Sequence, residues 1–319
     1  MKKIIILVMA AVLSLAVADA DARGKELKVL YWNIQNGMWA GQEDNYDAFV
    51  KWVKAQDADV CIWCEAETIY YTGTSKRLPR EDRYFIWDEV APRYGHKHIY
   101  VAGHRDGYPQ VITSKFPIEN VKKIVGDDRI VVTHGAGWAR VKAYGKTFNI
   151  VSLHTWPQKS HFRYKEASKE ERDASAARNE GDVNRLEEMT WICENTILTD
   201  PQAEDNYWLM AGDFNAVSPK DNWVYKFPEG DSRLLVHDYI LKNTPYVDVI
   251  WERHPRNFYT TTFEYKRIDF VYLSPALYGL VEDAQIVEDE YTRPHRHASV
   301  KNFQDPSDHL PIIVNFKIK

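Results

Sequence analysis

The stretch of sequence that decides the fold is Tyr207-Trp208-Leu209-Met210-Ala211-Gly212-Asp213-Phe214-Asn215. Residues 207–211 are apolar or aromatic, which is typical of a buried strand. Gly212 permits a tight turn of the backbone, so Asp213 and Asn215 are expected where the strand ends. There Asp213 could orient or deprotonate a water molecule, and Asn215 could donate a hydrogen bond to a phosphate oxygen. A turn with Asx capping would give the same local pattern, so the meaning of this stretch depends on the rest of the chain.

Four other polar stretches also stand beside short apolar runs. Because strand ends and the loops beyond them usually carry the chemistry of a fold, we expect these stretches to meet in one site. Together they contain nearly all the oxygen and nitrogen ligands that a metal-dependent phosphoester hydrolase needs. They are Trp32-Asn33-Ile34-Gln35, Glu65, Leu153-His154-Thr155, and Arg267-Ile268-Asp269 followed by Ser307-Asp308-His309.

The apolar patterns alternate between strands and helices. Residues 27–33 and 58–65 are predicted strands joined by a predicted helix at 46–56, which makes a β-α-β unit. A second amphipathic helix is expected at 184–198, a hairpin turn at 144–146, and long surface segments at 157–178 and 291–306. About ten strands with few helices favour two stacked β-sheets covered by helices. The further predicted strands are 99–102, 110–114, 130–133, 137–144, 146–154, 207–213, 267–273 and 312–318.

The first residues differ from the rest of the chain. Lys2 and Lys3 precede an apolar run at 4–18, and Ala18-Asp19-Ala20 provides small residues for cleavage. This pattern predicts a signal peptide at 1–22 and an exported protein, periplasmic or secreted. The alternative is a membrane anchor, but the run is about 15 residues long, and a span needs roughly 20. No linker divides residues 23–319, which we expect to form a single domain.

Charge and cysteine content limit the possible functions. The formal net charge of −5 gives no electrostatic footprint of a non-specific DNA binder, which disfavours duplex DNA as a substrate without excluding it. Three cysteines leave at least one free thiol. Cys61 and Cys64 lie three residues apart in a predicted strand, so their side chains should point to opposite faces and not form a bridge. We expect these two and Cys193 to be buried apolar groups.

Glu65 ends an apolar run, so its carboxylate must be solvated, paired or bound to a cation. Oxygen donors without a thiolate cluster favour Mg²⁺ or Mn²⁺ over structural zinc. The histidines His154 and His309 could stabilise an oxyanion when protonated, and Asp269 is a candidate to orient such a histidine. Arg267 could contact a phosphate or form a structural ion pair.

In this order, the five stretches resemble the endonuclease/exonuclease/phosphatase superfamily, which includes deoxyribonuclease I, AP endonucleases, neutral sphingomyelinases and inositol polyphosphate 5-phosphatases. Each motif is weak alone, but together they span residues 32–312. The resemblance implies a four-layer α/β/β/α sandwich, with two mixed β-sheets flanked by helices as in deoxyribonuclease I. It also implies a site for Mg²⁺ or Mn²⁺ at one edge of the two sheets.

The resemblance further implies a role for each matching residue. Glu65 would be the principal metal ligand, with Asn33 and Asp308 close to the metal and the phosphate. Asp213 would position the attacking water and Asn215 the phosphate. His154, and His309 paired with Asp269, would stabilise the pentavalent transition state or protonate the leaving group. Arg105 and Tyr108 align loosely with a phosphate-binding segment of the family.

Two positions depart from the family pattern. Gln35 stands where some nucleases of the family have an aspartate, and Cys64 stands where a glutamine is common. The side chains of Trp223, Tyr225 and Phe227 could stack on a substrate or simply pack under a loop. They follow Asp213 by about ten residues.

The sequence favours an exported divalent-metal-dependent phosphoester hydrolase, above all a phosphodiesterase, in which water attacks a metal-bound phosphate. Its substrate would be a nucleic acid, a lipid headgroup or a small phosphoester, and neither a protein partner nor stable membrane insertion is implied. Inositol 5-phosphatases are disfavoured, because their Trp and Cys-Asp-Arg elements are missing. Three alternatives remain: a sphingomyelinase-like phospholipase, although no apolar hairpin stands out, an inactive binding protein on the same fold, and an unrelated zinc- or calcium-binding surface protein.

Overall fold

The computed structural model describes residues 25–163, 165–301 and 303–318. The predicted signal peptide at 1–22 lies outside these residues, so export stays a prediction. Over the described ranges, no helix combines the length and the apolar character needed to cross a membrane.

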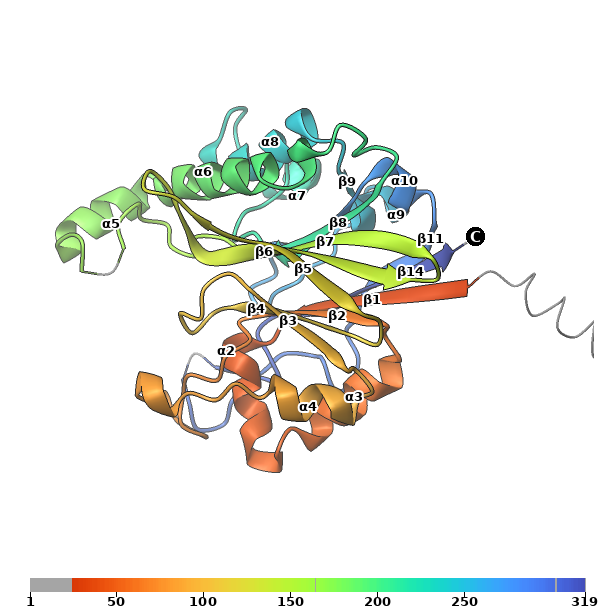
Figure 1. Cartoon of the computed structure of the whole chain (residues 1–319). Coiled ribbons are helices and arrows are strands. Elements are labelled where there is room, and N and C mark those ends of the chain that lie inside the picture. The colour runs from red at the N-terminus through yellow and green to blue at the C-terminus, as the bar shows by residue number, and fades with distance from the viewer. Residues whose placement is uncertain (1–24, 164, 302, 319) are drawn as a thin grey trace, which may run out of the picture.

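Two six-stranded sheets face one another at the centre of the molecule (Figure 1). The strand order is β11-β14-β1-β2-β4-β3 in the first sheet and β5-β6-β7-β8-β10-β9 in the second. Both sheets are mixed, since β1 pairs with β2 in parallel and β7 pairs with β8 in parallel, while the other pairs are antiparallel. The first sheet comprises β11 Val281–Ile286, β14 Ile312–Ile318, β1 Lys25–Asn33, β2 Val60–Cys64, β4 Gln110–Ser114 and β3 His98–Ala102. The second comprises β5 Ile118–Gly126, β6 Val131–Ala143, β7 Lys146–His154, β8 Tyr207–Asp213, β10 Asp269–Leu273 and β9 Val247–Asp248.

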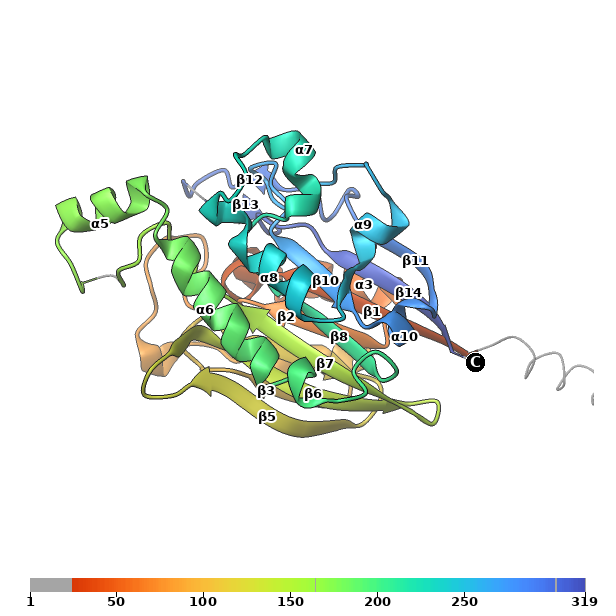
Figure 2. The same ribbon diagram turned by 90° about the horizontal axis from the view of Figure 1, so that it is seen from above.

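Helices cover the outer face of each sheet (Figures 1 and 2). The predicted four-layer α/β/β/α sandwich is therefore confirmed. The helices on the side of the first sheet are α2 Gln35–Met38, α3 Asp47–Gln56 and α4 Trp87–Arg93. Those on the side of the second are α6 Gly181–Glu194, α7 Asn222–Tyr225, α8 Leu235–Asn243, α9 Val249–Arg253 and α10 Pro275–Tyr278, while α5 Lys169–Ala177 projects beyond the sandwich. The short 3₁₀ helices are Trp39–Asp44, Arg80–Asp82, Ile197–Thr199, Pro219–Asp221 and Ser232–Leu234.

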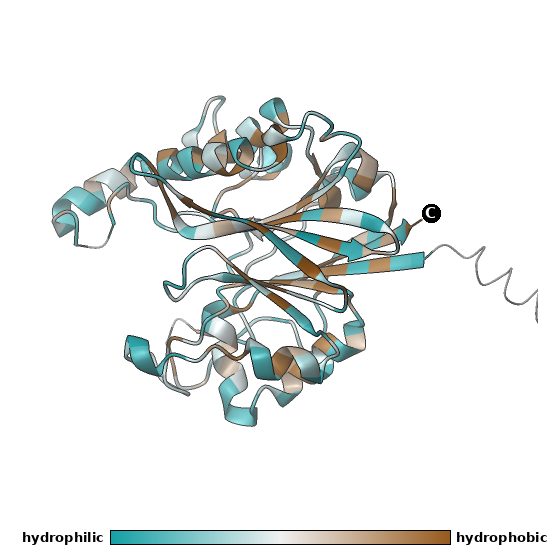
Figure 3. Ribbon diagram, in the orientation of Figure 1, coloured by the Kyte–Doolittle hydropathy of each residue, from teal (hydrophilic) through white to brown (hydrophobic). Residues whose placement is uncertain are grey.

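The central strands are buried on both faces. On β1, Tyr31 belongs to the core between the two sheets, and its neighbour Trp32 belongs to the core between the first sheet and its helices. A third core joins the second sheet to α6 and α8. Figure 3 shows apolar residues in all the layers, and in β2 and β8 they follow one another along the strand, as burial of both faces requires. Along these central strands the polar side chains concentrate at the ends, where the site lies.

Several local predictions match the structure. Strands β1 and β2 run parallel on either side of α3, as the β-α-β pattern predicted. Tyr144 and Gly145 form the turn between β6 and β7, with φ of 53° and 73°, and such positive values suit a tight hairpin. The cysteines are free and buried, with Cys61 and Cys64 on opposite faces of β2.

Two longer strands, three two-residue strands and one continuation were not predicted. The two-residue strands are β9, β12 His295–Arg296 and β13 Gln304–Asp305. Both β5 and β11 are edge strands with mostly exposed or half-buried residues, so neither carries a continuous apolar run. The predicted strands at 130–133 and 137–144 are one strand, β6, which passes through Gly135 without a break. Gly135 has φ of +72°, and a Cβ there would lie 2.3 Å from the Cα of Gly103. The backbones at Gly135 and Gly103 thus approach each other closely, which is one reason for a glycine inside a strand.

Candidate active site

The ends of the central strands bring the predicted polar residues to one end of the sandwich. In the first sheet, Asn33 is the last residue of β1, and Glu65 directly follows β2. In the second sheet, Asp213 pairs with His154 on β7 and with Asp269 on β10. These three residues thus form one row across the sheet, which faces Asn33 and Glu65 from the other sheet.

Asp213 lies at the centre of the site. Its Oδ2 accepts a hydrogen bond from Asn33 Nδ2 at 3.1 Å and lies 3.7 Å from His154 Nε2 and 3.8 Å from His309 Nε2. Burial raises the pKa of Asp213 to about 8, and the negative charge of Asp269 adds to this effect. Added positive charge nearby would favour the ionised form of this carboxyl.

His309 belongs to a hydrogen-bonded chain that ends inside the sheet sandwich. Its Nδ1 lies 2.7 Å from Asp269 Oδ2, and the hydroxyl of Tyr31 donates to Asp269 Oδ1 at 2.7 Å. Burial alone would lower the pKa of His309, but the carboxylates of Asp269 and Asp308 outweigh it and raise that pKa well above its usual value. The raised pKa favours the protonated form of His309, whose Nε2 lies 3.8 Å from Asp213 Oδ2.

Tyr31 is a site residue that was not predicted from the sequence. Its position two residues before Asn33 in β1 places both side chains on one face of the strand, and this spacing is the signal that could have identified it. The backbone of His309 is also tied to β1. Trp32 Nε1 donates to the His309 carbonyl at 2.8 Å, and Ser307 Oγ donates to the Asn33 carbonyl at 2.7 Å.

Glu65 faces the same space from the first sheet. It has φ of 57°, an uncommon value for a residue with a side chain. Its Oε2 accepts the N–H of Asn36 at 2.9 Å, and its Oε1 lies 3.5 Å from Asn33 Nδ2. Burial raises the pKa of Glu65, and the charge of Asp308 raises it further. Two carboxylates held close together in this way are a natural site for a cation.

His154 differs from His309 in its charge. Burial lowers the pKa of His154 far below its usual value, and the nearby His134 and His309 lower it further. His154 is therefore neutral. Its ring centroid lies 4.4 Å from that of His134, whose Nδ1 is 2.7 Å from Asp106 Oδ2. Sequence analysis missed the pair of His134 and Asp106, because only the tertiary structure brings β6 and the loop before β4 together.

Asn215 is fixed by its backbone and its side chain. It has φ of 47°, its N–H donates to Asp213 Oδ1 at 2.8 Å, and its Nδ2 donates to the Thr155 carbonyl at 3.2 Å. The hydroxyl of Thr155 in turn donates to the Phe214 carbonyl at 2.6 Å. These bonds hold the amide of Asn215 at the edge of the site.

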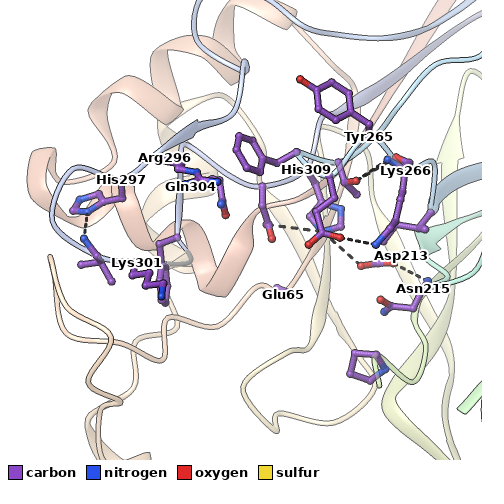
Figure 4. A pocket seen from close by; sticks show the side chains of 18 of the residues that line it. Glu65, Asp213, Asn215, Tyr265, Lys266, Arg296, His297, Lys301, Gln304 and His309 are labelled. Atoms are coloured by element: carbon purple, nitrogen blue, oxygen red, sulfur yellow. Dashed lines mark hydrogen bonds and ion pairs between the residues drawn. The ribbon is translucent and has the colours of Figure 1, made fainter. Parts of the chain in front are cut away.

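These side chains open into a cavity of about 1130 Å³. Figure 4 shows Asp213 and His309 side by side, with Glu65 nearby. The two outer walls come from a turn at residues 262–266 and from the segment 296–304. The residues of the cavity floor are Glu65, His154, Asp213, Asn215, Asp308 and His309.

The donor atoms fit a hard divalent cation beside Glu65. Asp213, Asp269 and His309 form a buried triad whose ligand atoms lie within 4.8 Å of one another. However, both Asp269 oxygens and the His309 Nδ1 are already used in hydrogen bonds. The carboxylates of Glu65 and Asp308 instead line the cavity, and the structure described here gives neither of them a lysine or arginine partner. Carboxylate oxygens open to solvent suit Mg²⁺ and Mn²⁺.

Asn33 bridges the two sheets. In the orientation described, its Nδ2 donates to Asp213 and Glu65, while its Oδ1 accepts the N–H of Gln35 at 3.1 Å. Asn33 thus holds the two carboxylates, and its role as a metal ligand stays a prediction. The side chain of Gln35 points away, towards Gln304, to which its Nε2 donates at 3.2 Å.

The two other predicted substrate-binding residues lie beside the site. Arg105 pairs with Glu67 at 2.5 Å and does not line the cavity. Tyr108 accepts a hydrogen bond from Arg77 at 2.8 Å, and its ring centroid lies 6.4 Å from that of His154. Burial raises the pKa of Tyr108, and Glu65 adds to the effect.

The remaining candidates have structural contacts. Arg267 is buried in an ion pair with Asp221 and another with Asp248, each at 2.7 Å, so the alternative of a structural ion pair holds. Tyr225 stacks on Phe227 with ring centroids 5.5 Å apart. These two rings and Trp223 lie outside the cavity lining.

Comparisons with known proteins agree with this architecture. The model of the endonuclease/exonuclease/phosphatase family matches residues 30–309, while a comparison with curated proteins finds no significant match. Among solved structures, an AP endonuclease from Archaeoglobus fulgidus is 17% identical with a TM-score of 0.57, covering 92% of this chain and 100% of its own. The human Nocturnin catalytic domain with bound sulfate is 14% identical with a TM-score of 0.56, covering 92% of this chain and 94% of its own. A Neisseria 3′ phosphatase bound to a product DNA hairpin is 17% identical with a TM-score of 0.56, covering 91% of this chain and 99% of its own.

Proposed function

Because the chain belongs to the endonuclease/exonuclease/phosphatase family, we propose that it hydrolyses phosphoesters, above all phosphodiesters, with a bound Mg²⁺ or Mn²⁺. One observation carries this proposal. The protonated His309 and the carboxylates of Glu65, Asp213 and Asp308 converge on one cavity floor. Such a floor can hold a cation, a phosphate and an attacking water together.

The side chains divide the reaction between them. A cation bound by Glu65 and Asp308 would draw charge from the phosphoryl oxygens as a Lewis acid. Asp213 orients the attacking water and accepts its proton at Oδ2, next to the neutral His154. Asn215 donates its amide N–H to a non-bridging phosphate oxygen.

His309 acts on the phosphate from a position next to Asp213. Its Nε2–H stabilises the charge of the pentavalent transition state or protonates the leaving oxygen. Asp269 keeps the imidazole protonated and oriented through Nδ1, and Tyr31 holds Asp269 in place. A proton donor and a proton acceptor therefore lie 3.8 Å apart, at His309 Nε2 and Asp213 Oδ2.

We also propose that the enzyme acts after export. This part of the proposal rests on the two lysines and the apolar run at residues 2–18 and on their likeness to a signal peptide. Expression of the full chain with a reporter fused at its C-terminus, followed by cell fractionation and mass spectrometry of the mature N-terminus, tests it. A cytoplasmic protein that keeps its first 20 residues would contradict it.

The function is tested with a panel of substrates in the presence of Mg²⁺. The panel comprises bis-p-nitrophenyl phosphate, p-nitrophenyl phosphate, plasmid DNA, RNA and sphingomyelin. Wild type is compared with Glu65→Gln and with Glu119→Gln, a control at an exposed position on β5. We expect one substrate class to be hydrolysed by the wild type and the control but not by Glu65→Gln. Hydrolysis that is unchanged in Glu65→Gln contradicts the mechanism, and binding of a phosphoester without turnover indicates the inactive binding protein.

A further inference from the structure

The cavity has an acidic floor and a basic rim. Three cationic side chains line its outer part, Lys266 on one wall and Arg296 and Lys301 on the other. We call these three residues the cationic rim. Figure 4 shows them set around the outside of the central group of Glu65, Asp213 and His309. The rim is unexpected in a protein with a net charge of −5.

Arg296 is positioned without an ion pair. Its backbone belongs to a two-stranded ladder in which β12 (His295–Arg296) pairs with β13 (Gln304–Asp305). Its guanidinium carbon lies 5.9 Å from the ring centroid of Phe263 on the opposite wall. Among the described residues, no carboxylate pairs with this guanidinium. Its five N–H groups are thus available to a ligand.

The other rim cations differ in their partners. Lys301 is exposed and, over the described chain, makes neither a hydrogen bond nor an ion pair. Lys266 pairs with the exposed Glu264 at 2.5 Å, and such a surface pair is easily exchanged for a stronger partner. Arg293, on the same segment as Arg296, instead pairs with Glu288 at 3.0 Å and does not line the cavity. Of these four cations, the two without an ion-pair partner among the described residues, Arg296 and Lys301, both line the cavity.

The cavity is so large that a small ligand on its floor would not reach the cationic rim. Sites for whole drug-sized ligands usually measure about 300–1,000 Å³, and this cavity measures about 1130 Å³. A single phosphate held by Asn215 and His309 on the floor would leave the rim without a ligand. Free cations at a distance from the scissile phosphate call for a second negative charge on the same molecule.

We propose that the substrate carries a second phosphate, or an equivalent anionic group, which the cationic rim binds while the floor holds the scissile phosphate. This inference rests on the proposed function and adds a substrate class to it. It favours multiply phosphorylated molecules over sphingomyelin and other substrates with a single phosphate.

The position of Tyr265 helps to decide whether the molecule with two phosphates is a nucleotide or a phosphorylated sugar. Its side chain lines the cavity, the residue is 80% exposed, and it lies between Glu264 and Lys266 at the tip of its turn. An exposed aromatic ring beside a cation suits stacking on a nucleobase, whereas a phosphorylated sugar would use the rim alone. Both sources share the chemistry of two phosphates joined by a sugar.

The test measures binding, so it does not depend on turnover. Calorimetry with Mg²⁺ compares thymidine 3′,5′-bisphosphate with thymidine 5′-monophosphate, and deoxyribose 3,5-bisphosphate with deoxyribose 5-phosphate. For wild type we expect the bisphosphate of at least one pair to bind about tenfold more tightly, the effect of two charge-assisted contacts. The preference should weaken as KCl is raised.

Variants then locate the preference. The double variant Arg296→Ala/Lys301→Ala should reduce the ratio of the two affinities to near one, and Arg296→Lys should restore part of it. Arg293→Ala is the matched control and should keep the wild-type ratio. Thermal melts of each variant establish that it is folded, as expected for substitutions at exposed positions.

Each outcome has one meaning. A preference in both pairs supports the rim as a general second-phosphate site, and a preference in the thymidine pair alone assigns it to nucleotides. Equal binding of bisphosphate and monophosphate in both pairs overturns the inference, as does a preference that survives in the double variant. Because binding is measured apart from hydrolysis, an inactive protein with an intact preference would contradict the proposed function and leave this inference standing.

Discussion

Arg267 and Asp269 stand two residues apart in the sequence but belong to two buried charge clusters of opposite design. In the first cluster, the guanidinium of Arg267 binds Asp248 through two nitrogens, at 3.0 and 2.7 Å, and Asp221 through Nε at 2.7 Å. In the second, four carboxylates face one protonated histidine, His309. Those carboxylates are Glu65, Asp213, Asp269 and Asp308.

The difference separates a structural cluster from a chemical one. Where the chain provides its own arginine, the hydrogen bonds are directed and the cluster is closed to the cavity. Where it provides too little positive charge, the remaining carboxylates open to the cavity and need a cation from solvent. Burial raises the pKa of Asp221 as it does that of Asp213, but Arg267 opposes the rise at Asp221. Near one strand end, buried carboxylates are thus balanced by an arginine of the chain in the first cluster and left open to a cation from solvent in the second.

The largest expected effect comes from removing the cation of the second cluster. EDTA should abolish hydrolysis, and added Mg²⁺ or Mn²⁺ should restore it, because neither Glu65 nor Asp308 has a lysine or arginine partner among the described residues. The fold should survive the treatment, since the Arg267 cluster needs no metal. Thermal melts provide a second measurement, in which Mg²⁺ raises the melting temperature of wild type but not of Glu65→Gln. Full activity in EDTA would contradict the claim that the second cluster, unlike the first, needs a cation from solvent.

The first cluster is broken by Arg267→Met. This change leaves two buried carboxylates without a cation, and we expect it to lower the free energy of unfolding by about 3–5 kcal/mol. Urea unfolding measures it. The control is Arg140→Met, at a surface residue 3.8 Å from Glu119, where the change should stay below about 1 kcal/mol. Similar losses in both variants would mean that the buried ion pairs of Arg267 contribute nothing particular.

Asp269→Asn tests the second cluster without removing a cavity-lining group. We expect kcat to fall on the order of 10²–10³-fold, because His309 loses the partner that keeps it protonated and oriented. The value of KM should change little, since Asp269 does not line the cavity. The pH profile of kcat in the variant should lose activity at a lower pH than wild type. A rise in KM with unchanged kcat would assign Asp269 to substrate binding instead.

An effect that is absent at neutral pH concerns His237, a buried histidine near the first cluster. Its ring lies 2.8 Å from the Tyr272 hydroxyl and 3.1 Å from the Ala216 carbonyl. Burial lowers its pKa from 6.5 to about 3. Between these values the unfolded chain binds a proton that the folded protein does not, so stability is full above pH 6.5 and falls as the pH drops towards 3. The slope is at most about 1.4 kcal/mol per pH unit.

His237→Gln removes this titration while keeping a donor and an acceptor. The fall in stability with pH should then be shallower than in wild type, as measured by urea unfolding at several pH values. His295→Gln, at a residue with a 69% exposed side chain, should leave the slope unchanged. An equal slope in wild type and His237→Gln would show that the acid sensitivity arises elsewhere.

The sequence predicts those parts of the molecule that its local patterns encode. The buried central strands carry apolar runs, and the sandwich with its β-α-β unit follows from them. The edge strands β5 and β11 were missed because their polar, half-exposed residues, such as Lys122 and Glu282, look like loop. A polar edge protects a sheet from pairing with other chains, so it resists detection by hydrophobic pattern.

The residues of the site likewise divide into those that the sequence predicts and those that it does not. Glu65, Asp213 and Asn215 follow apolar strands and could be found from that position alone. The pair of His134 and Asp106 could not, because the two residues lie 28 positions apart and meet only through the packing of a loop against β6. The partners of Arg267 are similarly invisible in the sequence, as Asp221 and Asp248 come from two separate segments.

The row of His154, Asp213 and Asp269 restricts where this chain can change length. A residue inserted within β7 or β8 would turn every later side chain of that strand to the other face, including His154 or Asp213 at its end, and the row would be lost. The described residues of the segments 157–178 and 296–304 lie outside the ladders of β7, β8 and β10, so a longer or shorter version leaves every pair in the row intact. Insertions or deletions around the cavity mouth would therefore change the surface that binds a ligand. The catalytic residues of the cavity floor would keep their positions.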